Sequence, residues 1–477
     1  MKILYAASEA VPFCKTGGLA DVAGSLPPAL AEQGAETAVI LPLYRRVREK
    51  FADQLTFLCY DYVDLAWRHT YCGLFSMKKD GVIWYFLDNE QYFDRPELYG
   101  YVDDGERFGF FSRAVVKMLD HLEFWPDVIH CNDWQTALIP IYLKDDGVRE
   151  DRYRSIRTVL TIHNIEYQGR YDPYCLGDLF GLDRGWVDDG TLLLDGDLNL
   201  LKGAILTADA VNAVSPTYAQ ELKNPYFAHR MEGILTQCGY KLSGVLNGID
   251  MKLYDPAADG RITANYTAED LSGKAADKTA LQNLMGLNEE PNTPIIAMVS
   301  RLVSHKGLDL LREVMGDIME LPAQFVVLGS GDAGYEEFFR RTAERYPGRM
   351  AVRLGYNEAL SMAIYAGADL FLMPSRSEPC GLSQMISMRY GTVPIVRETG
   401  GLKDTVLPYN KFTGEGRGFT FSDVNAGDML WVIREAVDLY YNDKEAWRGL
   451  QKAGMTADFS WDHSAQEYLD IYQRISG

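Results

Sequence analysis

The sequence predicts an α/β protein with two Rossmann-like, doubly wound domains that face each other across a cleft. Short apolar runs alternate with segments of helical periodicity along most of the chain. Polar residues directly follow several of these runs, as expected where the carboxyl ends of parallel strands form a ligand-binding edge. The alternation restarts after a polar stretch at 255–277, and 477 residues exceed what one core usually supports.

The first half contains the strands of the predicted N-terminal domain. Expected strands cover residues 3–8, 37–42, 127–130, 158–162 and 210–214. Helical periodicity predicts helices over 19–33 and 105–121. Residues 55–88 hold several period-two stretches, which predict antiparallel strands inserted into a parallel fold.

The second half repeats the strand–helix alternation and predicts another doubly wound domain. Its expected strands cover residues 295–300, 323–328, 350–354, 368–373 and 393–396. A terminal helix is expected from about 460 to 475. The segment around Val245–Asp250, followed by the polar stretch 255–277, marks the predicted domain boundary.

Composition narrows the class of protein. The 47 basic and 67 acidic side chains give a net charge of −20, which repels nucleic acid and anionic membranes, so neither is expected as a partner. The seven cysteines are scattered without C-x-x-C pairs and are expected to be reduced. Neither a signal peptide nor a long apolar segment is found, so we expect a cytoplasmic protein. The sequence leaves the oligomeric state open.

Metal sites are not expected from the spacing of the ligand-type residues. The histidines show no H-x-x-x-H or H-E-x-x-H spacing, which disfavours zinc. Acidic groups at 103–104, 188–189 and 195–197 raise a metal-binding alternative, but each lacks a third ligand, so solvated surfaces are the favoured interpretation.

A glycine turn between the first strand and helix is a candidate ligand loop. Gly17 and Gly18 allow backbone N–H groups to approach a phosphate or sugar, and Lys15 adds a positive charge. The alternative is a plain glycine turn with a solvated lysine.

Glu378 is the central candidate of the second half. It lies in a loop framed by proline and glycine, after the apolar run 368–373 and before a predicted helix. Ligands bind at this edge of open α/β sheets. The alternative is an acid that only stabilises a helix dipole. His163 follows another strand, and a lone histidine in that position favours a structural interpretation over a catalytic one.

Together these residues favour glycosyl transfer from a nucleotide sugar. Lys15, Arg301 and Lys306 suit a diphosphate, and they lie near glycine turns at 17–18, 329–331 and 400–401. Fixed cations stabilise a departing diphosphate without a metal. Acceptors for sugar hydroxyls are expected at Glu378, Asp21, Asp133 and Asn247.

The same motifs resemble those of bacterial glycogen synthases and plant starch synthases, over essentially the whole chain. The segment KTGGLADV at 15–22 is similar to the family's N-terminal signature, and EPCGL at 378–382 and TGGL at 399–402 are similar to blocks of its second domain. Further matches are His163-Asn164, Asn247–Asp250 and Arg301–Gly307. The chain departs from the family pattern at Ser383, where Thr is common, and at Phe93, where some members carry Tyr.

The resemblance implies a glycosyltransferase of GT-B architecture that transfers glucose from ADP-glucose to the non-reducing end of an α-1,4-glucan such as glycogen. The transfer is retaining and needs neither metal nor cofactor. The implied catalytic residues are Glu378, Lys306, Arg301 and His163. The implied substrate-binding residues are Lys15, Gly17, Gly18, Asp21, Asp133, Asn164, Asn247, Tyr356, Cys380, Gly381, Leu382, Gly400 and Gly401.

The resemblance also sets the expected domains. An acceptor-side domain spans 1–244 and is joined by the returning helix at 457–477, and a donor-side domain spans 245–456. Rival hypotheses are a UDP-glucose-dependent transferase of the same architecture and a glucan- or nucleotide-binding protein without turnover. A glucan phosphorylase is disfavoured because no pyridoxal phosphate lysine motif is found.

Overall fold

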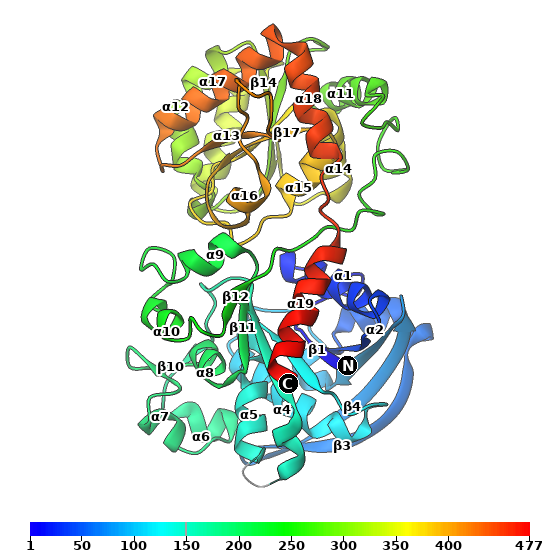
Figure 1. The fold of residues 1–477 in the computed structure, drawn as a ribbon, viewed down its shortest axis with the longest axis vertical. Helices are drawn as coiled ribbons and strands as arrows, with labels where there is room; N and C mark the ends of the chain where they lie inside the picture. The colour runs from blue at the N-terminus through cyan, green and yellow to red at the C-terminus, as the bar shows by residue number, and fades with distance from the viewer. Residues whose placement is uncertain (148–149) are drawn as a thin grey trace. The chain divides into compact units, whose positions relative to one another are not determined.

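The computed structural model describes residues 1–147 and 150–477, which divide into two units (Figure 1). Unit 1 comprises Met1–Asn247 and Trp461–Gly477, and unit 2 comprises Gly248–Ser460. The chain leaves unit 1 once and returns to it, so the C-terminal helix belongs to the N-terminal unit. The polar stretch 255–277 lies within unit 2.

Unit 1 is built on a nine-stranded sheet with the order β12-β11-β7-β6-β1-β2-β5-β4-β3. The strands from β12 to β5 are parallel. They are β1 (Lys2–Ala6), β2 (Glu36–Pro42), β5 (Val82–Asp88), β6 (Val128–Asn132), β7 (Arg157–Ile162), β11 (Ala210–Ala213) and β12 (Leu242–Gly244). Their apolar runs are almost entirely buried, as expected for parallel strands covered on both faces.

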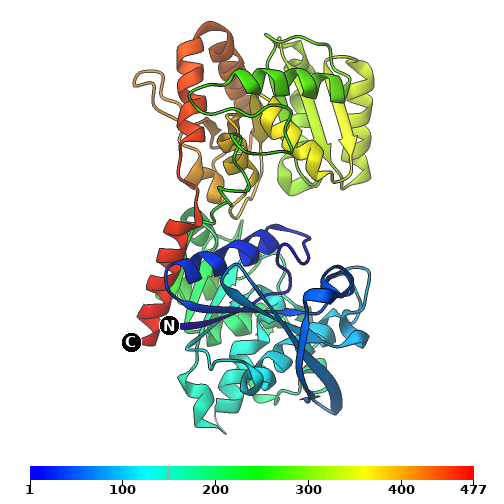
Figure 2. The ribbon, with the colours of Figure 1, turned by 90° about the vertical axis from the view of Figure 1, so that its right-hand side faces the viewer.

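The long hairpin of β3 (Thr56–Leu65) and β4 (Arg68–Lys79) extends this sheet, and its curved strands are visible in Figure 2. β4 pairs antiparallel with both β3 and β5. The predicted insertion of antiparallel strands is therefore present, but its last strand, β5, also pairs in parallel with β2. A small separate sheet holds β8 (Arg170–Tyr171), β9 (Leu193–Leu194) and β10 (Asp197–Asn199).

The helices of unit 1 pack around the nine-stranded sheet. They are α1 (Gly18–Glu32), α2 (Arg45–Phe51), α3 (Glu90–Phe93), α4 (Asp104–Lys117), α5 (Leu138–Gly147), α6 (Cys175–Phe180), α7 (Gly185–Asp188), α8 (Leu200–Thr207), α9 (Pro216–Glu221), α10 (Glu232–Gln237) and α19 (Trp461–Ser476). Side chains cap several of them: Ser215, for example, accepts a hydrogen bond from the Tyr218 backbone N–H at the start of α9.

The terminal helix α19 lies beside α1 (Figure 1). Two buried tyrosines anchor it to the strands of unit 1. Tyr468 Oη accepts a hydrogen bond from Asn212 Nδ2 at 2.8 Å, and Tyr472 Oη lies 2.6 Å from His130 Nδ1. Because both partners are fully buried, these bonds satisfy polar groups that would otherwise be left without water.

Unit 2 has a six-stranded parallel sheet with the order β15-β14-β13-β16-β17-β18. The strands are β13 (Ile295–Val299), β14 (Gln324–Gly329), β15 (Met350–Leu354), β16 (Leu370–Met373), β17 (Val393–Arg397) and β18 (Phe419–Phe421). The first five match the predicted strands, whereas β18 was not predicted. This order is that of a doubly wound fold, whose direction reverses between β13 and β16.

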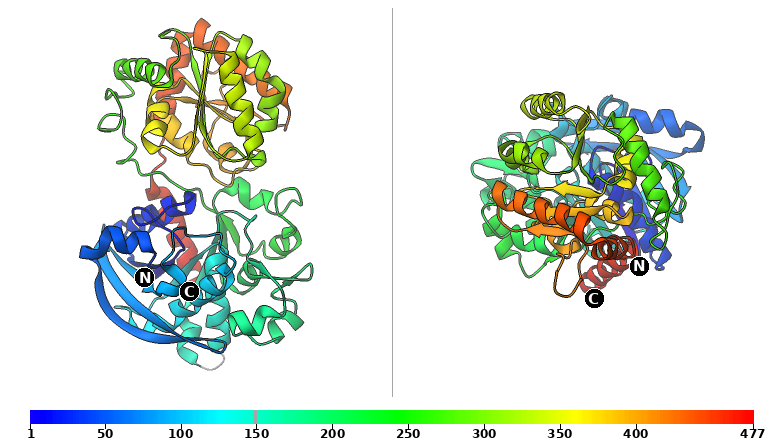
Figure 3. Two further views of the ribbon diagram at one scale, coloured as in Figure 1. Left: turned by 180° about the vertical axis from the view of Figure 1, so that it is seen from behind. Right: turned by 90° about the horizontal axis from the view of Figure 1, so that it is seen from above.

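Helices cover both faces of this sheet, as the left view of Figure 3 shows. They are α11 (Ser272–Met285), α12 (Leu308–Glu320), α13 (Ala333–Arg345), α14 (Glu358–Gly367), α15 (Ser383–Arg389), α16 (Gly400–Thr405), α17 (Ala426–Asn442) and α18 (Lys444–Met455). Leu311, Met315 and Ile318 form the apolar stripe of α12 and are buried in the same core cluster as Ile433 of α17. On the opposite face, the ring of Tyr365 from α14 contacts Phe371 of β16.

Candidate active site

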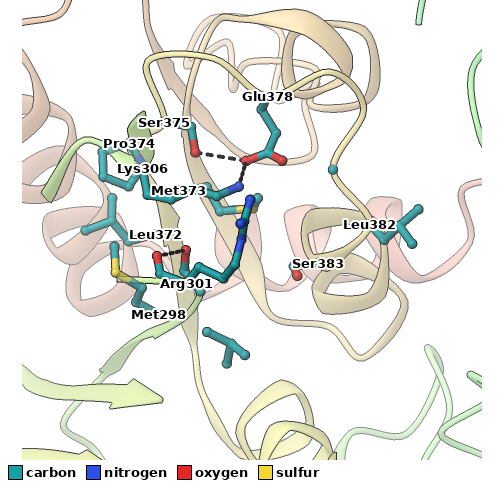
Figure 4. Close-up of a pocket in the computed structure, with 13 residues that line it drawn as sticks. Met298, Arg301, Lys306, Leu372, Met373, Pro374, Ser375, Glu378, Leu382 and Ser383 are labelled. Atoms are coloured by element: carbon teal, nitrogen blue, oxygen red, sulfur yellow. Dashed lines mark hydrogen bonds and ion pairs between the residues drawn. The ribbon is translucent and has the colours of Figure 1, made fainter. Parts of the chain in front are cut away.

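A cavity of about 190 Å³ opens in unit 2 at the carboxyl ends of β13 and β16 (Figure 4). These neighbouring strands flank the point where the winding of the sheet reverses, which is where open α/β sheets bind ligands. The cavity brings together the predicted residues Arg301, Lys306, Glu378, Gly381 and Leu382. Three cavity-lining serines were not predicted as site residues: Ser300, Ser375 and Ser383.

Glu378 lines this cavity, and the residue is only 8% exposed. Its Oε2 accepts a hydrogen bond from Lys306 Nζ at 2.6 Å and another from Ser375 Oγ at 3.0 Å. Burial acts to raise the pKa of Glu378, but the Lys306 ammonium and the Ser375 hydroxyl outweigh it and hold that pKa below its ordinary value. The carboxylate is therefore ionised at neutral pH and acts as a hydrogen-bond acceptor.

Arg301 adds a second cation to the cavity. Its side chain extends toward Lys306 in Figure 4. Within the part of the chain that the structure describes, its guanidinium has neither a hydrogen-bond nor an ion-pair partner. Two cations and one carboxylate leave the cavity with excess positive charge, which suits an anionic ligand.

Glycines hold the Glu378 loop in place. A Cβ at Gly400, which has φ +44°, would lie 2.0 Å from the Glu378 carbonyl oxygen, and one at Gly401 would lie 2.1 Å from the Cys380 carbonyl oxygen. Only glycine permits this close approach of α16 to the loop. Gly400, Gly401 and the buried Cys380 therefore support the cavity without lining it.

The remaining residue predicted in unit 2, Tyr356, is 76% exposed and does not line the cavity. It follows β15 at the edge of the sheet, and β14 lies between β15 and β13. Phe93, one of the two departures from the family pattern, is fully buried in unit 1 and packs against Tyr44 and Phe110. Its side chain belongs to the core.

In unit 1, the predicted glycine loop lies between β1 and α1. Lys15 Nζ forms an ion pair with Asp21 Oδ1 at 2.7 Å, so these two predicted residues contact each other. Gly17 has an extended backbone, and a Cβ at Gly18 would meet no atom within 4 Å. The loop therefore has open space at Gly18, where a ligand could approach the backbone.

Glu9 holds this loop and was missed by the sequence reasoning. It is buried, and its Oε2 accepts hydrogen bonds from the backbone N–H and the hydroxyl of Thr16. Burial raises the pKa of Glu9 to about 7, although Thr16 and the Gly17 backbone N–H counteract this shift. Its only sequence signal was an acid closely following a strand.

Asp133 and His163 follow the neighbouring strands β6 and β7. Asp133 has φ +56°, a strained value for a residue other than glycine and one that clusters at functional sites. Its Oδ1 accepts a hydrogen bond from the His163 backbone N–H at 2.8 Å, and the Asn164 backbone N–H also bonds to the carboxylate. Burial raises the pKa of Asp133 to about 7.

His163 is neutral, because burial lowers its pKa to about 3. Its Nε2 lies 2.9 Å from Asn132 Oδ1, and Asn132 Nδ2 donates to the Ala6 carbonyl oxygen. This orients Asn132 Oδ1 as an acceptor, so His163 Nε2 carries the proton and Nδ1 has an acceptor lone pair. The ring is thus suited to accept a hydrogen bond rather than to donate a proton from a charged form.

Asn247, the last residue of unit 1 before the chain enters unit 2, is 5% exposed. Its Oδ1 has no hydrogen-bond partner among the described residues. A buried acceptor without a partner is costly and is explained where a ligand supplies the donor.

The described residues offer neither a metal-binding cluster nor a membrane-spanning helix. Residues 1–147 and 150–477 contain no group of three or more His, Cys, Asp or Glu side chains arranged to hold a metal ion. The described helices also include none with the length and apolar character needed to cross a membrane.

Comparisons with known proteins cover both units. Residues 2–237 match the starch synthase catalytic domain, and residues 284–448 match the glycosyl transferases group 1 family. Glycogen synthases of Bacillus cereus (strain Q1) and Ligilactobacillus salivarius are each 47% identical to this chain, with all of both chains covered.

Solved structures extend the match to the fold. The catalytic domain of starch synthase IV from Arabidopsis thaliana, bound to ADP and acarbose, is similar with a TM-score of 0.90 and 34% identity, covering 99% of each chain. Sucrose-phosphate synthase from Thermosynechococcus elongatus is 17% identical with a TM-score of 0.62, covering 99% of this chain and 98% of its own, and shows the fold alone. The chain therefore belongs to the glycogen and starch synthase family of GT-B glycosyltransferases.

Proposed function

We propose that this protein is a glycogen synthase, which transfers glucose from ADP-glucose to the non-reducing 4-hydroxyl of an α-1,4-glucan, with retention, and releases ADP. The cavity of unit 2 is the observation that carries the proposal, because it places two cations beside a buried, ionised carboxylate. Relatives named glycogen synthase at 47% identity over the whole chain support the same activity.

In the proposed reaction, the bond between the glucose anomeric carbon and the diphosphate breaks, and a bond to the acceptor oxygen forms. Negative charge grows on the diphosphate as it leaves, and Arg301 and Lys306 stabilise that charge. The sugar becomes oxocarbenium-like, so acceptors on its hydroxyls stabilise the transition state. The acceptor hydroxyl loses a proton and the released phosphate groups take it up, which balances the charge.

Glu378 has two roles in this proposal. It accepts hydrogen bonds from the sugar hydroxyls, and it orients the Lys306 ammonium through their 2.6 Å contact. Ser375 fixes the same carboxylate oxygen at 3.0 Å, so the acceptor is already positioned before the donor binds.

Unit 1 supplies the remaining proposed contacts. We assign Lys15 to the donor phosphates, and Asp21, Asp133, His163, Asn164 and Asn247 to the glucose and acceptor side. Three features of unit 1 support this assignment: the open space at Gly18, the strained backbone of Asp133 and the unpartnered oxygen of Asn247. No metal or cofactor takes part in the proposed step, and a cytoplasmic location stays a prediction.

The choice of ADP-glucose over UDP-glucose is supported by the starch synthase structure that contains ADP. Nucleoside diphosphate release from glycogen reactions, with each nucleotide sugar in turn and with both in competition, tests it. We expect ADP-glucose to give the higher kcat/KM. A higher kcat/KM with UDP-glucose would mean that UDP-glucose is the donor. Binding of either nucleotide sugar without release of a nucleoside diphosphate would identify a non-catalytic protein.

A further inference from the structure

The β3–β4 hairpin of unit 1 carries a row of aromatic rings that the proposed transfer site does not use. Cross-strand neighbours in an antiparallel pair share a face of the sheet. The register pairs Phe57 with Phe75, Tyr60 with Gly73, Tyr62 with Tyr71 and Asp64 with His69. We call the face formed by these eight positions the aromatic face.

A β-bulge places these rings together. The register shifts by one residue between Phe57 and Cys59, so Tyr60 and Tyr62 fall on the same face as Phe57. Without the shift, residues such as Cys59 and Asp61 would occupy that face, because a one-residue slip exchanges the two faces of a strand. The bulge is thus the feature that gathers the rings on one side.

The rings of the aromatic face contact one another. Tyr62 stacks on His69 with ring centroids 4.7 Å apart, and the ring centroids of Tyr60 and Tyr71 are 5.8 Å apart. Phe57 meets Phe75 edge to face at 5.2 Å. Even so, Tyr60 is 59% exposed and Tyr62 is 43% exposed, so the rings form a packed platform that remains open to solvent. Exposed aromatic groupings of this kind mark interaction sites.

The aromatic face continues toward the Lys15 loop. Phe75 pairs with Phe86 of β5, and the ring of Phe86 packs against Phe13, which lies just before Lys15 in the chain. Backbone pairing therefore links Phe75 of the aromatic face to Phe86, whose buried ring packs against the segment that leads into the proposed substrate loop.

We propose that the aromatic face is a second binding site for the α-glucan acceptor, at which the polysaccharide docks while its non-reducing end reacts elsewhere. The apolar faces of pyranose rings pack on tyrosine rings, and the phenol groups and Asp64 hydrogen-bond to sugar hydroxyls. This inference rests on the proposed function, because a polymeric acceptor can engage two sites of one enzyme and gain avidity.

The charge of the hairpin favours a neutral polysaccharide over other occupants. The aromatic face has no lysine or arginine, and the whole chain has a net charge of −20, which disfavours nucleic acid and anionic surfaces. A second copy of this acidic chain would meet the same repulsion. Strand pairing between copies is further disfavoured by the bulge and by Asp61, whose carboxylate on the other face is paired with Lys117.

The test compares the full-length enzyme with the double variant Tyr60→Ser/Tyr62→Ser. Glycogen affinity is measured by electrophoresis through glycogen-containing gels, and ADP release is measured with glycogen and with maltotriose as acceptors. We expect glycogen affinity to fall and KM for glycogen to rise about tenfold. The kcat with maltotriose and the KM for ADP-glucose should stay within about twofold, because neither uses the aromatic face.

Two further variants serve as controls. Tyr60→Phe/Tyr62→Phe keeps the aromatic rings and should retain most of the glycogen affinity. This variant shows whether the serine variant binds glycogen less tightly because stacking is lost or because the hairpin is misfolded. Tyr240→Ser removes a tyrosine of unit 1 that is 84% exposed and lies outside the aromatic face, and it should change nothing. Unchanged glycogen binding by the double serine variant would overturn the inference, as would a change in oligomeric state caused by that variant. If the wild-type enzyme releases no ADP with either acceptor, the proposed function fails instead.

Discussion

Glu378 and Lys306 are the pair on which the proposed chemistry depends most. The substitution Glu378→Gln keeps the shape of the side chain but removes the charge that balances Lys306 and weakens acceptance from sugar hydroxyls. We expect kcat for ADP release to fall by roughly 10²-fold or more, with KM for ADP-glucose changed much less. Steady-state kinetics check this.

The matched control is Glu337→Gln, which changes a partly exposed carboxylate of α13 that is paired with two arginines. It should leave kcat within about twofold of wild type. Near-wild-type turnover in a folded Glu378→Gln protein would remove Glu378 from the proposed site.

The buried carboxyl group of Glu9 should make the free energy of unfolding depend on pH. Because the folded-state pKa of Glu9 is raised from 4.5 to about 7, the folded protein binds more protons than the unfolded chain between these values. The free energy of unfolding therefore falls as pH rises through this window. Glu9→Gln removes that contribution, so the variant should gain stability relative to wild type between about pH 5 and about pH 8. Urea unfolding at each pH measures the difference, and a pH-independent difference would contradict the burial argument.

The charged residues that line the unit 2 cavity were easier to predict from sequence than the residues that hold the candidate sites in place. Arg301, Lys306 and Glu378 follow apolar strands in glycine-rich contexts, and the structure brings these three together. Ser375 and Glu9 were missed because a sequence does not reveal which small or acidic side chain becomes buried beside a partner. The ion pair between Lys15 and Asp21 was likewise not predicted, because both residues were expected only to contact a ligand.

At the scale of elements, the approach of α16 to the Glu378 loop depends on glycine. In Gly401→Ala the new Cβ would lie 2.1 Å from the Cys380 carbonyl oxygen, so backbone must shift. We expect a loss of about 1–3 kcal/mol in the free energy of unfolding and at least a roughly tenfold loss of kcat, because the loop carries Glu378. Denaturant unfolding and ADP release measure the two effects.

Gly449→Ala is the corresponding control in α18, where an added Cβ meets no atom within 4 Å. This substitution should raise stability by roughly 0.5–1 kcal/mol and leave kcat unchanged. Equal behaviour of the two alanine variants would show that the close approach at Gly401 is unimportant.

The attachment of α19 to unit 1 gives another prediction. Tyr472→Phe removes the hydroxyl that lies 2.6 Å from His130 Nδ1 and leaves a buried ring nitrogen without that partner. The free energy of unfolding of unit 1 should fall by about 1–3 kcal/mol. Chemical denaturation measures it against Tyr226→Phe, which alters an exposed tyrosine of the same unit and should be neutral. Equal stability of both variants would argue against the anchoring role.

Long periodic elements were predicted well, and short or irregular ones were not. The strands and helices with clear apolar periods were found within a few residues, but β18 has only three residues and gives no usable period. The bulge in β3 was also missed, because register is set by pairing with β4 rather than by the sequence of one strand.

At the scale of the whole molecule, the two units each contain a complete doubly wound sheet and their own set of candidate residues. The sequence indicated this organisation because the strand–helix alternation stops and restarts. The proposed reaction requires both units, since Lys15 belongs to unit 1 and Lys306 to unit 2.

The need for both lysines is measured by ADP release from ADP-glucose in the presence of glycogen, compared among wild type, Lys15→Ala and Lys306→Ala. Arg340→Ala, which removes an exposed arginine of α13, is the control and should match wild type. We expect the wild type to release ADP and either lysine substitution to lower kcat/KM by roughly 10²-fold or more while the protein stays folded. Wild-type rates in either lysine variant, or no ADP release by the wild type, would contradict it.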